Sequence, residues 1–111
     1  MPGTLQYDLL FGALADATRR DIVRRAMDGA EGVVELAGHY PMSFAAVQKH
    51  VAVLERAGLV TKVRNGRRKV VRTHVESLQV VQRLLDDYEE LWRDRIARMT
   101  ELIEETEEEQ P

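Results

Sequence analysis

Leu59–Thr73 has the sequence LVTKVRNGRRKVVRT, in which β-branched residues lie on both sides of Asn65-Gly66. Such residues suit paired strands, and Asn-Gly tolerates the positive φ angles of a type I′ turn. We therefore predict a β-hairpin over residues 59–73, with Asn65 and Gly66 at the centre of its turn.

The segment before this hairpin has the pattern of two short helices joined by a tight turn. An apolar pattern begins at Val33 and stops at Gly38, and Pro41 then fixes its own φ angle and restricts the residue before it. Ser43 is suited to cap a second helix. Inside that helix, Val47, Val51, Leu54 and Ala57 follow a three-to-four spacing. Residues 33–57 are therefore predicted to form a helix-turn-helix with a turn of three or four residues.

Two more helices are predicted before this motif. Residues 5–15 carry leucines at helical spacing, and residues 16–28 form a second helix whose cap is either Asp16 or a capping box of Thr18 and Asp21. The fold class is then mainly α with a small β-hairpin (α+β), a winged helix-turn-helix. We expect residues 1–106 to form one such domain.

A long helix is predicted over residues 75–105, which lack proline and glycine and carry an apolar residue in alternating steps of three and four. Such a helix is about 45 Å long, more than the small core can cover, so a second copy of the chain is its simplest partner. The glutamate-rich residues 107–111 are expected to fray. Candidate residues of this homodimer interface are Leu5, Leu9, Leu10, Leu78, Val81, Leu85, Tyr88, Trp92, Met99 and Leu102.

Composition excludes several classes of function. The 111 residues include no cysteine, which excludes disulfides, thiolate metal sites and cysteine nucleophiles. No apolar run approaches the roughly 20 residues of a membrane span, and the N-terminus lacks a signal-peptide pattern, so we expect a cytoplasmic protein with no membrane partner. No paired nucleophile and base, glycine-rich phosphate loop or metal constellation is present, so we expect no enzyme, no cofactor and no metal.

Charge is unevenly distributed along the chain, although the formal net charge is only -3. Residues 43–72 contain eight lysines and arginines against one acid, Glu55, whereas six glutamates and no base follow from residue 101 onward. This segregation predicts a cationic surface over the Ser43–Ala57 helix and the hairpin, suited to double-stranded DNA.

The side chains of these two elements suggest how DNA would be contacted. The exposed N-terminal half of a helix can enter the major groove, where Gln48 suits adenine and Lys49 suits guanine or a phosphate. Phe44 or the alanines suit a thymine methyl group, although Phe44 fits the core equally well and His50 can instead form a hydrogen bond at the helix surface. The helix candidates are Ser43, Phe44, Ala45, Ala46, Gln48, Lys49 and His50. The wing candidates, on the backbone or minor groove, are Arg64, Asn65, Arg67, Arg68 and Lys69. Arg19 and Arg20 are either further backbone contacts or ordinary helix surface charges.

Together these segments resemble the ArsR family of winged helix-turn-helix repressors over nearly the whole chain. The matching motifs are Leu14-Ala15-Asp16-Ala17-Thr18-Arg19, Val33-Val34-Glu35-Leu36-Ala37, Val47-Gln48-Lys49-His50-Val51, Leu54-Glu55-Arg56-Ala57-Gly58-Leu59-Val60 and Asn65-Gly66-Arg67. The resemblance implies a homodimer joined by its first and last helices, which binds an inverted-repeat operator and represses by occluding a promoter.

The sequence is more similar to the non-metal-sensing branch of that family. Metal-sensing members use cysteines in the third helix or aspartate and histidine ligands in the last helix, whereas this chain has Glu35–His39 in the former and no histidine in the latter. The sequence leaves open whether a small-molecule inducer binds, and it identifies none. Trp92 lies either in the dimer core or in the lining of a pocket for such an inducer. A protein-interaction module that uses the long last helix without specific DNA binding is the alternative function.

Overall fold

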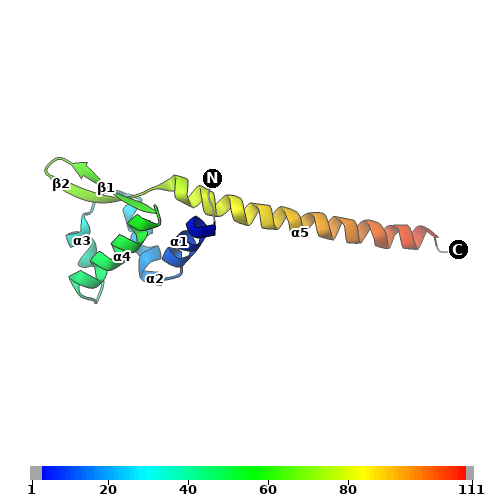
Figure 1. Ribbon diagram of the computed structural model, residues 1–111, viewed down its shortest axis with the longest axis horizontal. Coiled ribbons are helices and arrows are strands. Elements are labelled where there is room, and N and C mark those ends of the chain that lie inside the picture. The colour runs from blue at the N-terminus through cyan, green and yellow to red at the C-terminus, as the bar shows by residue number, and fades with distance from the viewer. Residues whose placement is uncertain (1–3, 110–111) are drawn as a thin grey trace. The chain divides into compact units, whose positions relative to one another are not determined.

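A computed structural model describes residues 4–109, which divide after Val81 into two units. In chain order the elements are α1 (Thr4–Leu14), α2 (Ala17–Ala26), α3 (Val33–Ala37), α4 (Phe44–Arg56), β1 (Val60–Asn65), β2 (Arg68–Thr73) and α5 (Val75–Glu109) (Figure 1). The predicted fold class, mainly α with one antiparallel hairpin, is confirmed. The first unit holds α1 to α4, the hairpin and the start of α5, and the second is the rest of α5. None of the helices described between residues 4 and 109 has the length and apolar character of a membrane span.

The core of the first unit takes apolar side chains from each of the helices α1 to α4 and from the hairpin. Leu10, Ile22, Leu36 and Leu54, one from each helix, are almost completely buried. Leu59, Val60, Val70 and Val71 supply the contribution of the hairpin and the residue before it. Burial of each such side chain contributes about 1.5–3 kcal/mol. The helix-turn-helix and the hairpin are therefore fixed to one common core.

The start of α2 is capped by Asp16, whose carboxylate accepts a hydrogen bond from the Arg19 backbone amide at 3.0 Å. Of the two caps that the sequence left open, this is the one that forms. The bond also lowers the pKa of Asp16, because it favours the charged form. Both N-terminal helices end earlier than predicted, α1 at Leu14 and α2 at Ala26.

The connection between α3 and α4 is longer than the predicted three or four residues, since α3 ends at Ala37 and α4 begins at Phe44. The backbone amides of His39 and Tyr40 bond to carbonyls three residues earlier, which forms turns rather than a continued helix. The Tyr40 hydroxyl then donates to Asp21 on α2 at 2.7 Å, and this bond joins the connection to α2.

The hairpin turn differs from the predicted type I′ turn. Asn65 pairs with Arg68 across the strands, so the two-residue loop is Gly66-Arg67 rather than Asn65-Gly66. Gly66 has a φ angle of 68°, and no non-glycine residue among those described has a positive φ. A positive φ at only the first loop position, occupied by glycine, is the pattern of a type II′ turn. Asn65 thus extends β1 instead of forming the turn.

Helix α5 continues to Glu109, beyond the predicted end at residue 105. No proline or glycine interrupts the segment, and the Thr106 hydroxyl bonds back to the Leu102 carbonyl at 2.9 Å. Gln110 and Pro111, the rest of the predicted frayed tail, lie outside the described residues.

Candidate nucleic-acid interface

Helix α4 buries one face and exposes the other. Ser43 caps it by accepting a hydrogen bond from the Ala46 backbone amide at 3.1 Å. Val47, Val51 and Leu54 point into the core, whereas Ala45, Gln48 and Lys49 are exposed. The N-terminal half of α4 therefore presents an exposed surface, as the sequence predicted.

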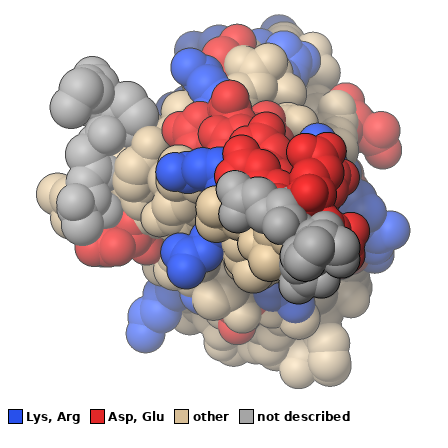
Figure 2. Space-filling view, turned by 90° about the vertical axis from the view of Figure 1, so that its right-hand side faces the viewer, with Lys and Arg blue, Asp and Glu red and all other residues tan. Residues whose placement is uncertain are grey.

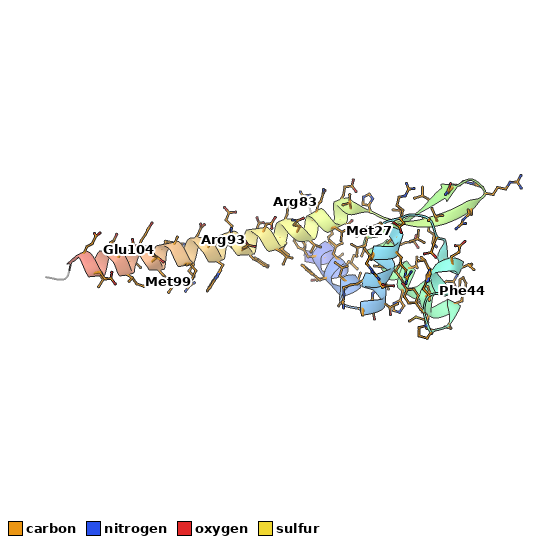
Figure 3. The ribbon with its side chains drawn as sticks, turned by 180° about the vertical axis from the view of Figure 1, so that it is seen from behind. Met27, Phe44, Arg83, Arg93, Met99 and Glu104 are labelled. Atoms are coloured by element: carbon orange, nitrogen blue, oxygen red, sulfur yellow. The ribbon has the colours of Figure 1, made fainter. Side chains whose placement is uncertain are left out.

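Phe44 lies on the surface at the start of α4, with 45% of its area exposed (Figure 3). Of the two places that the sequence left open for this side chain, the structure favours the surface over the core. Ala46 is half-buried. An exposed aromatic side chain beside Gln48 and Lys49 is available for apolar contact with a thymine methyl group.

His50 contacts α2 instead of pointing freely outward. Its Nδ1 atom lies 3.2 Å from Arg19 Nη1. Arg19 also donates to the carbonyls of Ala13 at 2.8 Å and Gly12 at 3.0 Å, and Arg20 donates to the Leu14 carbonyl at 2.7 Å. The last carbonyls of a helix need such donors. Arg19 and Arg20 therefore close the C-terminus of α1, and Arg19 links it to α4.

The hairpin carries its cations in two different environments. Arg64 and Lys69 are directly opposite each other across the strands, and like charges in this position repel. Arg67 is exposed in the turn, and no acidic side chain among residues 5–108 pairs with Arg67 or Lys69. Arg68, in contrast, forms an ion pair with Glu35 at 2.8 Å. The tip therefore holds uncompensated positive charge, which an anion would stabilise.

The acidic residues near this surface are each paired with a base. Glu55 lies 3.4 Å from Lys62, Glu35 pairs with Arg68, and Glu31 lies 2.7 Å from the ring of His39. These pairs leave Lys49 on α4 without an acidic partner among the described residues. Six of the eight cations predicted for α4 and the hairpin therefore have no acidic partner among the described residues: Lys49, Arg56, Arg64, Arg67, Lys69 and Arg72.

A carboxylate at the base of the helix-turn-helix is held in the charged form. Asp21 Oδ2 accepts hydrogen bonds from the Tyr40 hydroxyl at 2.7 Å and from Arg25 Nε at 2.9 Å, and Arg24 bonds to the other oxygen. These donors, with Tyr40 the strongest, hold the pKa of Asp21 far below its ordinary value. Burial, followed by the bond to Asp21, raises the pKa of Tyr40 to about 12.

The predicted dimer residues divide between the core and the surface. Leu5, Leu85, Tyr88, Trp92, Met99 and Leu102 are 51–73% exposed. Leu9 and Leu78 are partly buried against the core. Leu10 and Val81, also predicted for the interface, are 0% and 9% exposed within the single chain and so offer almost no surface to a partner.

Helix α5 exposes more apolar residues than the heptad pattern indicated. Leu91, Ile96 and Ile103 are 43–64% exposed, and Leu91 and Ile103 lie one position beside predicted interface residues. They widen the apolar stripe, which a strict heptad reading misses. Met99 and Arg93 point to different sides of the helix (Figure 3). Acidic side chains gather at the C-terminal end of the same helix (Figure 2).

The described histidines, aspartates and glutamates do not come together as a metal site. Within residues 4–109, no group of three or more such side chains is placed to hold an ion. The three histidines lie on separate segments, with His39 beside Glu31, His50 beside Arg19 and His74 beside Glu76.

Comparison with known proteins finds relatives along most of the chain, although no family model matches it. The chain is 36% identical over 97 residues to the HTH-type transcriptional regulator Rv2034 of Mycobacterium tuberculosis, which covers 87% of this chain and 88% of that protein. A crystal structure of an ArsR family transcriptional regulator is 32% identical, with a TM-score of 0.75 over 82% of this chain and 94% of that one. The solution structure of a homodimeric winged helix-turn-helix DNA-binding domain from Mycobacterium bovis, 24% identical, matches in fold with a TM-score of 0.59 over 74% and 80%.

Proposed function

Because the chain belongs to the ArsR family of helix-turn-helix transcriptional regulators, we propose that it is a dimeric, sequence-specific DNA-binding repressor. The observation that carries this proposal is the exposed N-terminal half of α4 on the same compact unit as a hairpin on which Arg64, Arg67 and Lys69 lack acidic partners among the described residues. Helix α4 enters the major groove, and the Arg64–Lys69 wing binds the phosphate backbone or the minor groove.

Sequence preference comes from α4 in this proposal. Gln48 hydrogen-bonds to adenine, Lys49 reaches guanine or a phosphate, and Phe44 and Ala45 contact thymine methyl groups. Ser43 already caps the helix, so its hydroxyl is at most a phosphate contact. His50 is turned toward Arg19 and is a weaker candidate for base contact than the sequence indicated.

Affinity without sequence preference comes from the wing. Arg64, Arg67 and Lys69 neutralise phosphates, and Asn65 lies at the end of β1 beside them. The opposition of Arg64 and Lys69 supports this role, because it costs stability in the free protein and is relieved beside an anion.

The second copy of the chain covers the apolar stripe of α5, with Trp92 in the dimer core. Its side chain and those of Leu85, Tyr88, Met99 and Leu102 are at least 51% exposed in the single chain. Leu5 on α1 is a further contact with the partner. The homodimeric relative in fold supports this assembly. A two-fold dimer would recognise an inverted repeat with half-sites about 34 Å apart.

The cysteine and histidine content of the chain is consistent with the non-metal-sensing branch. The sequence has no cysteine, and its histidines lie on separate segments with partners of their own. We therefore propose regulation without a bound metal, and no catalytic role.

Selection of random DNA fragments by the purified protein tests the proposal. We expect an enriched inverted repeat, and an affinity for it that falls about 10³- to 10⁵-fold between 50 and 200 mM salt if about 6 to 10 phosphates are neutralised. Failure to enrich any sequence, together with a flat salt response, would instead support a protein-interaction module.

A further inference from the structure

Glu35 and Arg68 connect the hairpin to the start of the helix-turn-helix. Arg68, the first residue of β2, directs its Nη2 atom to the Ala30 carbonyl at 3.0 Å and to Glu35 Oε1 at 2.8 Å. The other carboxylate oxygen of Glu35 accepts a hydrogen bond from the Gly32 backbone amide at 2.5 Å. Gly32 is the N-cap of α3. One carboxylate therefore holds both the first turn of α3 and the first residue of β2.

The backbone of the same segment lies directly against β2. The Val71 amide donates to the Glu31 carbonyl at 2.8 Å. A Cβ atom placed on Gly32 would lie only 2.7 Å from the Lys69 carbonyl oxygen, so residue 32 must be glycine for this approach. The wing strand is thus joined to residues 30–35 at several neighbouring points.

We propose that Glu35 and Arg68 form a strut that positions the wing for DNA, and that Arg68 is a positioning residue rather than a phosphate contact. This inference rests on the proposed function. Arg68 differs from Arg67 and Lys69, which have no acidic partner among the described residues. Because Glu35 neutralises it, Arg68 adds little net charge to the surface that attracts phosphates.

The backbone bonds distinguish this strut from an ordinary surface ion pair. Arg68 and Glu35 side chains are 51% and 44% exposed, and isolated pairs at that exposure contribute little. Glu55 and Lys62 form such an isolated pair, 37% and 41% exposed, and neither side chain bonds to the backbone of the described residues. The Glu35 pair, in contrast, is extended by the Gly32 amide and the Ala30 carbonyl, and such networks restrict motion more than single pairs.

Glu35→Gln separates positioning from direct contact by the sign of its effect. The glutamine can still accept from the Gly32 amide, so the cap of α3 is kept. If Arg68 binds phosphate directly, loss of the competing carboxylate frees it, and DNA binding becomes tighter. If the strut positions the wing, binding becomes weaker although a negative charge has been removed.

The experiment measures the dissociation constant for the selected DNA with the full-length chain, for the wild type, Glu35→Gln, Arg68→Gln and the double variant. Glu55→Gln is the matched control for removal of one negative charge. We expect Glu35→Gln and Arg68→Gln each to weaken binding about three- to tenfold, with no further loss in the double variant. The control is expected to stay within about twofold of the wild type.

An independent measurement is the heteronuclear NOE of backbone amides in the free protein. The amides of Gly66 and Arg67 are expected to become more mobile in both single variants, while those of α4 do not change. Any of three results would refute the positioning role of Glu35 and Arg68. These are wild-type or tighter DNA binding by Glu35→Gln, additive losses in the double variant, and an unchanged NOE at Gly66 and Arg67. Absence of specific binding by the wild type would refute the proposed function alone, and the NOE would then decide the strut.

Discussion

Asp21→Asn is expected to destabilise the chain by about 2 kcal/mol near neutral pH. The substitution keeps the shape of the side chain but removes the negative charge of the carboxylate. That carboxylate accepts hydrogen bonds from Tyr40 at 2.7 Å and from Arg25 at 2.9 Å. A hydrogen bond to a charged group contributes about 1.5–3 kcal/mol when buried. Asp21 is 26% exposed and the third donor, Arg24, is 74% exposed, so only the first two bonds count and each is partly screened.

The loss should depend on pH in a defined direction. The pKa of Asp21 is lowered in the folded state, so its stabilisation is complete above the unfolded value of 3.8 and is lost as the pH falls toward the folded pKa. The free-energy difference between wild type and Asp21→Asn should therefore shrink by about 1 kcal/mol between about pH 6 and about pH 3.

Urea unfolding followed by circular dichroism at fixed protomer concentration measures this difference, since dimerisation contributes to apparent stability. Asp8→Asn is the matched control, because Asp8 is exposed on α1 and has no partner among the described residues. The control should stay within about 0.5 kcal/mol of the wild type at each pH. A deficit in Asp21→Asn that is the same at both ends of the pH range would refute the lowered pKa.

Three other substitutions test the site and the fold. Gln48→Ala should relax the sequence preference of DNA binding. Arg67→Ala should weaken binding to all DNA sequences alike and reduce the slope of log affinity against log salt concentration by about one. Competition binding at several salt concentrations measures both effects, and equal effects on specificity would contradict this division. Trp92→Ala should raise the dimer dissociation constant by about tenfold or more in sedimentation equilibrium without unfolding the first unit, and an unchanged constant would remove Trp92 from the interface. Gly58→Ala should cost about 1–2 kcal/mol in urea unfolding, because its φ angle is 77° and a Cβ would lie 3.2 Å from Ser77 Oγ; a neutral result would show that the helix end can relax.

Local patterns in the sequence predicted the elements that depend on neighbouring residues. The hairpin, the cap at Ser43 and the exposed face of α4 follow from spacings of two to four residues, and the structure contains all three. The turn type was wrong because Asn-Gly can occupy more than one register, and the pairing of Asn65 with Arg68 is set by the strands.

Contacts between distant segments could not be predicted in this way. Leu10 and Val81 belong to apolar stripes that continue onto exposed residues, and only the packed core shows where burial within one chain stops. Arg19 and Arg68 looked like free cations because their acceptors, the α1 carbonyls and Glu35, lie elsewhere in the chain. No sequence spacing indicates that Glu35 serves two elements at once.

The exposed apolar stripe of α5 has a consequence for dosage. A second copy must cover Leu85, Tyr88, Trp92 and Met99 in the proposed dimer. When the protomer concentration is below the dimer dissociation constant, most of the protein is therefore monomeric and cannot bind a two-fold operator. The amount of dimer then rises as the square of the amount of protomer. Halving synthesis of the protein would lower operator occupancy about fourfold in that range, so a modest change in expression would be transmitted as a steeper change at the promoter.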